Sequence, residues 1–162
     1  MPNGESVEER LDAMGLCLPD AQVIPTGMRL SYRRLVRHRD VVYVAGHGPT
    51  LGAGWGYRGK VGREVTLDEG VQAARLTGLN ILGTIRRELG SLDHIGTWLK
   101  ITGYVNAVEG FTDQAIVVNG CSDLFIELFG EERLAARTSV GVSDLPFGMP
   151  VEVDAVLTWT AA

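Results

Sequence analysis

The segment ARTSVGVSDLPFGMPVEVDAVLT, residues 136–158, contains two alternating patterns separated by a break. Apolar and polar residues alternate over Arg137–Val142 and over Val151–Leu157, and β-branched residues are frequent in both, which predicts two β-strands. Between them lie residues that interrupt strands: Pro146, Gly148 and Pro150. We therefore predict that the chain reverses here and that the two strands pair as a hairpin.

The predicted hairpin would gather polar side chains on one face. If Val142 pairs with Val151, the alternation of strand side chains places one cation, one hydroxyl and two carboxylates on the same surface. These side chains are Arg137, Ser139, Glu152 and Asp154. A shift of the pairing by one residue would send both acids to the other face, so this prediction depends on the register.

The composition of the chain is that of one globular domain, with 162 residues of which 45% are hydrophobic and 22% charged. A net charge of -5 argues against a protein whose main ligand is nucleic acid, which needs a concentrated basic face. The local basic segment Arg29–Arg39 could attract an anion, but it is also typical of a charged edge strand. Because Cys17 and Cys121 form no metal-binding pattern and no leader sequence is evident, we expect a cytoplasmic protein that does not contact membranes.

The rest of the chain predicts an α+β order of elements. Residues 1–25 are expected to be an N-terminal extension with a short helix that begins near Ser6, and residues 26–162 the main domain. The expected elements of that domain are strands Leu30–Val36 and Val41–Ala45 in a hairpin, a helix from Thr66 to Gly90, a strand Ile95–Val105 and a helix Phe111–Phe129. Two helices cover only one face of such a sheet, so we expect a second copy of the chain on the other face.

Several segments carry a resemblance to a known family. The closing segment has Arg137, then Leu145-Pro146, then Glu152 followed by Asp154; the segment Tyr43–Pro49 reads YVAGHGP; and Val118 precedes Asn119 in the second helix. Together they resemble the RidA/YjgF family, in which an arginine, a Leu-Pro pair and a Glu-x-Glu motif have the same spacing. The resemblance implies a chorismate-mutase-like fold, a mixed sheet with two long helices on one face, assembled as a homotrimer with clefts between subunits.

The same resemblance implies an activity and a set of site residues. The activity would be hydrolysis of reactive enamines or imines, such as 2-aminoacrylate, to 2-oxo acids and ammonia, with no cofactor and with a small carboxylate-bearing metabolite as ligand. Arg137 matches the family's carboxylate-binding arginine, and Glu152 matches the glutamate that handles water or protons. The expected substrate-binding residues are Arg137, Ser139, Asn119, Gly46 and His47; many members carry cysteine at the position of Ser139 and glutamine at that of His47.

The residues themselves allow other interpretations. Arg137 can hold a carboxylate through two hydrogen bonds and Glu152 can transfer a proton, but the two could equally form a surface ion pair. The hydroxyl of Ser139 could act as a nucleophile or only donate a hydrogen bond, and His47 could face the cleft or fill a turn. Two further functions therefore stay open: a non-catalytic sensor of 2-oxo acids, and the ribonuclease activity attributed to members of this family.

Overall fold

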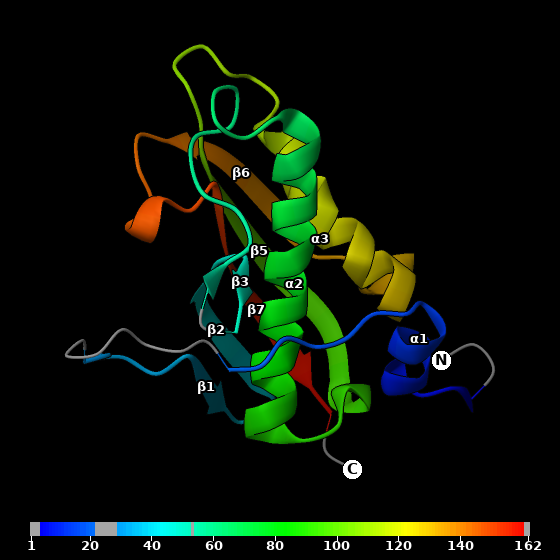
Figure 1. Ribbon diagram of the computed structural model, residues 1–162. Coiled ribbons are helices and arrows are strands. Elements are labelled where there is room, and N and C mark those ends of the chain that lie inside the picture. The colour runs from blue at the N-terminus through cyan, green and yellow to red at the C-terminus, as the bar shows by residue number, and fades with distance from the viewer. Residues whose placement is uncertain (1–3, 22–28, 53, 161–162) are drawn as a thin grey trace.

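The computed structural model of the protein describes residues 4–21, 29–52 and 54–160, which form an α+β fold (Figure 1). The strands are β1 (Leu35–His38), β2 (Val41–His47), β3 (Thr50–Leu51), β4 (Gly54–Trp55), β5 (Ile95–Asn106), β6 (Ala136–Val142) and β7 (Val151–Trp159). The helices are α1 (Val7–Ala13), α2 (Leu67–Leu89) and α3 (Gln114–Phe129), with short 3-10 turns at Leu92–His94, Glu131–Arg133 and Pro146–Gly148. The domain boundary predicted after residue 25 lies outside the described residues.

Local sequence signals explain where the helices begin and end. The Thr66 hydroxyl accepts from the Glu69 backbone N–H at 3.2 Å, and the Glu69 carboxylate accepts from the Thr66 N–H at 2.8 Å. This capping box starts α2, and Gly90, at a φ of 94°, ends it. The box predicted at Ser6 also forms and starts α1, whose Val7 and Leu11 are buried in the main core.

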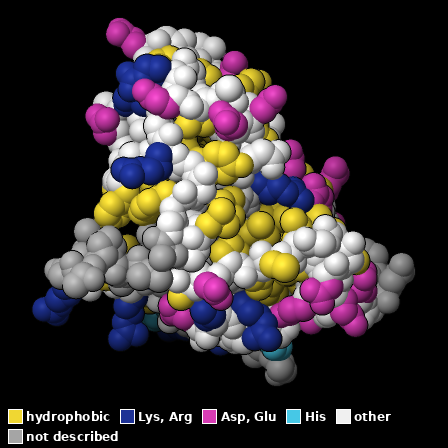
Figure 2. Space-filling view, in the orientation of Figure 1, with side chains coloured by type: hydrophobic (Ala, Val, Ile, Leu, Met, Phe, Trp, Pro, Cys, Tyr) yellow, Lys and Arg dark blue, Asp and Glu magenta, His cyan; other side chains and the backbone are white. Residues whose placement is uncertain are grey.

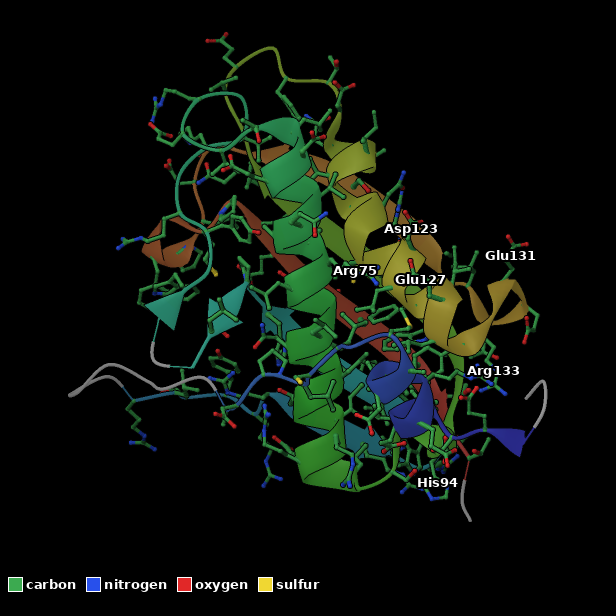
Figure 3. All side chains as sticks on the ribbon, turned by 45° about the vertical axis from the view of Figure 1, so that its right-hand side comes forward. Arg75, His94, Asp123, Glu127, Glu131 and Arg133 are labelled. Atoms are coloured by element: carbon green, nitrogen blue, oxygen red, sulfur yellow. The ribbon has the colours of Figure 1, made fainter. Side chains whose placement is uncertain are left out.

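The helices α2 and α3 lie side by side over one face of the sheet (Figure 1). Between them, Arg75 of α2 donates to both carboxylate oxygens of Glu127 of α3 at 3.2 and 2.6 Å, and Figure 3 shows these side chains next to one another. Beneath α3, the ring of Trp98 from β5 stacks on Phe125 with 3.9 Å between centroids. The core therefore lies between this helix pair and the sheet, as the helical periodicity predicts.

The predicted pairing of the last two strands is wrong. The five-stranded sheet has the order β1-β2-β7-β5-β6, so β5 lies between β6 and β7. Strand β5 is parallel to β6 and antiparallel to β7. The connection 143–150 is therefore a crossover, not a hairpin turn: it passes the end of β5, where the Asn106 N–H donates to the Pro150 carbonyl at 2.9 Å and the Asn106 amide donates to the Met149 carbonyl at 3.0 Å. The hairpin predicted for β1 and β2 does form, with β1 shifted to Leu35–His38.

The inserted strand also changes which side chains share a face. Residues paired across a sheet point to the same side, and Arg137 pairs with Ile101, whereas Glu152 pairs with Tyr104. Successive side chains of a strand point to opposite sides, and Ile101 and Tyr104 are an odd number of residues apart on β5. Their side chains therefore point to opposite sides of the sheet. The prediction that Arg137 and Glu152 share one face of the subunit is therefore wrong.

The face opposite the helices displays apolar side chains to solvent. Val36, Tyr43 and Val140 are 46%, 53% and 37% exposed there, and no described helix covers them. Figure 2 views the helix-covered side, where acidic side chains gather over α1 and basic ones near β1 and the end of α2. Among the described helices, none is long and apolar enough to cross a lipid bilayer.

Candidate functional site

Arg137 is held in place by α3. Its Nη1 donates to the Asn119 side-chain oxygen at 2.8 Å and to the Ser122 hydroxyl at 3.0 Å, while Nη2 donates to the Ala115 carbonyl at 3.2 Å. These partners lie one turn apart along one side of the helix, where i, i+3 and i+4 residues are neighbours. Arg137 and Asn119, which were each expected to bind substrate, therefore contact one another directly, and Ser122 and Ala115 are partners that the sequence motifs did not indicate.

Two donors of Arg137 remain available for a ligand. A guanidinium group has five N–H bonds, and the three hydrogen bonds above leave Nε–H and one Nη2–H without a partner in the described part of the chain. Two N–H groups on one planar cation are what a carboxylate needs for two-point binding. On the same face of β6, the Ser139 hydroxyl oxygen is buried and has no hydrogen-bond partner among the described residues.

Glu152 lies on the other face of the sheet, in close contact with Gly46. A β-carbon at Gly46 would overlap the Glu152 carboxylate, so glycine is required for this side chain to lie against the β2 backbone. Burial, together with the negative charge of the nearby Asp154, raises the pKa of Glu152. A carboxyl group with a raised pKa keeps its proton to a higher pH, which makes Glu152 a candidate proton donor.

Tyr104 and Asp154 complete this acidic group on the uncovered face. The Tyr104 hydroxyl donates to the Asp154 carboxylate at 3.0 Å, and this bond raises the pKa of Tyr104. Tyr104 was not identified from the sequence, although its place in the alternation of Lys100, Thr102 and Tyr104 along β5 gives a signal for that face.

His47 is separated from both groups. Its side chain is buried under α2, where Nδ1 lies 2.7 Å from the Ala45 carbonyl and Nε2 lies 2.8 Å from the Thr84 hydroxyl. Because a carbonyl can only accept, Nδ1 carries the proton and Nε2 accepts from Thr84. Burial lowers the pKa of His47 to about 4, so the ring is neutral at pH 7. We expected His47 either to face the cleft or to fill a turn. It instead lies at the end of strand β2 with its side chain buried.

Two adjacent cavities, of about 510 and 380 Å³, open beyond the ends of β5 and β6 and share Lys60 and Arg63. Lys60 Nζ donates to the Asn106 side chain at 2.6 Å and also bonds the Ser143 carbonyl, so its charge is already engaged. Neither cavity is lined by Arg137 or Glu152. Within the described ranges, no three His, Cys, Asp or Glu side chains come together in a way that could hold a metal ion.

Comparisons with known proteins agree with this architecture. Residues 8–154 match the family described as "YjgF/chorismate mutase-like, putative endoribonuclease". The chain is 37% identical over 152 residues to Protein TCP17 of Trypanosoma cruzi, covering 93% of this chain and 92% of that protein. It also resembles the crystal structure of Atu1372 from Agrobacterium tumefaciens, a protein of unknown function, with a TM-score of 0.85, 32% identity and coverage of 96% and 93%.

A Shewanella oneidensis protein that shares the endoribonuclease description superposes with a TM-score of 0.86 at 26% identity, covering 95% of this chain and 99% of its own. These likenesses extend over nearly the whole chain. The profile match alone covers most of the described strands and helices. The chain therefore belongs to the YjgF/chorismate-mutase-like family.

Proposed function

We propose that the protein hydrolyses reactive enamines or imines of small amino acids, such as 2-aminoacrylate, to 2-oxo acids and ammonia, in a cleft between subunits of a homotrimer. The observation that carries the proposal is the fixed guanidinium of Arg137, which keeps two N–H groups available. Such a pair matches the two oxygens of a carboxylate, the group that these metabolites carry. The residues that the RidA/YjgF resemblance assigns to substrate binding include this arginine.

The opposite placement of Arg137 and Glu152 favours a site built from two subunits. Within one subunit the sheet separates the two side chains, so a substrate could contact both only if each came from a different copy. The exposed apolar side chains opposite the helices, Val36, Tyr43 and Val140, offer a surface for such packing. The strand that carries Arg137, β6, lies at the edge of the sheet, where a neighbouring copy can reach it.

In this arrangement each side chain has one task. Arg137 binds the substrate carboxylate and so fixes the amino-bearing carbon in the cleft. Protonated Glu152 gives its proton to the terminal carbon of the enamine, which becomes an iminium. The resulting carboxylate takes a proton from the water that attacks the iminium carbon, and the aminoalcohol collapses to a 2-oxo acid and ammonia. Glu152 ends each turnover protonated, and its raised pKa favours that state.

The test is an assay with a dehydratase that releases 2-aminoacrylate from serine. Purified protein should accelerate the formation of the 2-oxo acid above the rate of hydrolysis in water. Arg137→Ala should lower kcat/KM at least about tenfold, since charge-assisted hydrogen bonds are lost. Arg63→Ala is the matched control, because Arg63 is an exposed arginine that forms an ion pair with the adjacent Glu64. Absence of any acceleration by the wild-type protein would rule out the hydrolase.

A non-catalytic carboxylate sensor is the second candidate, because the described contacts of Arg137 need no acid beside it. Calorimetric titration with pyruvate separates the two: a sensor binds pyruvate through Arg137 but produces no turnover. Ribonuclease activity, which the family description and the Shewanella relative's name suggest, is weaker on physical grounds. The net charge of -5 disfavours binding of a phosphate backbone. Incubation with labelled RNA at low and high salt tests it directly.

A further inference from the structure

We propose that Ser122 is a positioning residue: its hydroxyl fixes the plane of the Arg137 guanidinium so that the free Nε–H and Nη2–H face a ligand. This inference rests on the proposed function only where it concerns substrate, since the orientation of the guanidinium can be measured without one. Ser122 has no role in the family motifs described above. It lies on α3 with 8% of its surface exposed, and its hydroxyl contacts Arg137 directly.

Nη1 of Arg137 has two hydrogen-bond acceptors. Asn119 Oδ1 and Ser122 Oγ accept from this one nitrogen at 2.8 and 3.0 Å, so both of its N–H bonds are used. The five N–H bonds of a guanidinium lie in one plane. Rotation of the guanidinium must break both of these hydrogen bonds, so the Ser122 hydroxyl adds to the barrier that the acceptors Asn119 and Ala115 set. Asn119 and Ser122 can both accept from Nη1 because i and i+3 residues share a helix face.

The remaining contact fixes the direction in which the free donors point. The Ala115 carbonyl, one turn earlier on α3, accepts from Nη2 at 3.2 Å. All three acceptors lie on α3. The Nε–H and the second Nη2–H therefore remain available to a ligand that approaches Arg137 from the side away from this helix. Of the three acceptors, only the Ser122 hydroxyl can be removed without changing the backbone or an amide that the family resemblance already assigns to the site.

Removal of the hydroxyl has a predictable cost. The partly buried cation would lose one charge-assisted hydrogen bond, and an N–H of Nη1 would have to turn to find another acceptor. Any such rotation carries Nε–H and Nη2–H with it, because the group is rigid and planar. Carboxylate binding would weaken even though Arg137 and its charge remain, and it should weaken by about tenfold, the lower range for a hydrogen bond to a charged group.

The experiment compares Ser122→Thr with Ser122→Val. The two new side chains have the same shape, but valine has a methyl group where threonine has the hydroxyl. Ser122→Ala against the wild type is a second pair that adds no atom, in case the extra methyl group prevents folding. NMR of nitrogen-15-labelled protein measures the rotation of the Arg137 guanidinium, with the resonances assigned by their loss in Arg137→Lys. We expect slow rotation in the wild type and in Ser122→Thr, and rotation at least about tenfold faster in Ser122→Val and Ser122→Ala.

Binding and kinetics give the second readout. The dissociation constant for pyruvate and the KM for the enamine should rise about tenfold in Ser122→Val but not in Ser122→Thr, while kcat changes little. Equal rotation rates in the threonine and valine variants would overturn the inference. If the hydroxyl controls rotation but the wild-type protein does not accelerate enamine hydrolysis, the positioning role is supported and the proposed function is rejected instead.

Discussion

The buried His47 should make the protein lose stability in mild acid, and Gln at this position should remove much of that loss. The ring is neutral between the Ala45 carbonyl and the Thr84 hydroxyl, and burial lowers its pKa to about 4 against 6.5 for the exposed side chain. The Ala45 carbonyl opposes this shift, while the positive charges of Arg34 and Arg87 add to it. Glutamine can hydrogen-bond both partners, and it is the residue that the RidA/YjgF resemblance suggests here.

The sign and size follow from proton linkage. Between the folded and unfolded pKa values the unfolded state binds more protons, so stability falls as the pH drops from about 6.5 towards about 4. From pH 7 to pH 5 the histidine contributes a loss of about 2 kcal/mol, and about 3 kcal/mol once the pH is below both values. Carboxylates such as Glu64, whose pKa is lowered to about 2, mainly by its hydrogen bond from Arg63, affect both proteins equally.

The assay is urea unfolding followed by the fluorescence of the buried Trp98 and Trp159, at pH 7 and pH 5 and at one protein concentration. The free energy of unfolding of the wild type should fall by about 2 kcal/mol more than that of His47→Gln. Binding studies at pH 7 should show no difference between the two proteins, since His47 is buried under α2 and its hydrogen-bond partners are Ala45 and Thr84. Equal losses of stability in the two proteins would refute a neutral, buried His47.

Three further predictions test other parts of the account. Gly46→Ala should lower kcat/KM for the enamine relative to Gly54→Ala by more than any difference in Tm accounts for, because the new methyl group displaces the Glu152 carboxylate. Gly54→Ala is the control because the nearest atom to a β-carbon there is 3.6 Å away. Asp154→Asn should lower the pKa of Glu152 by removing a neighbouring negative charge, measured by carbon-13 NMR titration of the side-chain carboxyl; an unchanged midpoint would contradict the coupling. Thr66→Ala should lower the free energy of unfolding by about 1 kcal/mol in urea, and Thr66→Ser should not, because the serine hydroxyl keeps the cap.

The helices and the family could be predicted from the sequence because their signals are local. The capping boxes at Ser6 and Thr66 form between residues three apart, so no distant contact is needed to set them. The strand alternation likewise located β5, β6 and β7 to within a residue or two. The motif around Arg137 identified the family, which the comparisons confirm. The Val118-Asn119 pair in the second helix, part of the same resemblance, pointed to Asn119, whose oxygen accepts a hydrogen bond from Arg137.

The arrangement of the strands required the three-dimensional structure. The alternation of apolar and polar residues indicates which residues of a strand point to the same side. It does not indicate which strand lies alongside, because strand pairing joins residues far apart in the chain. The entry of β5 between β6 and β7 places Arg137 under α3 and Glu152 on the uncovered face. The same long-range packing buries His47 and brings Ser122 to the guanidinium, contacts between segments that no spacing along the chain encodes.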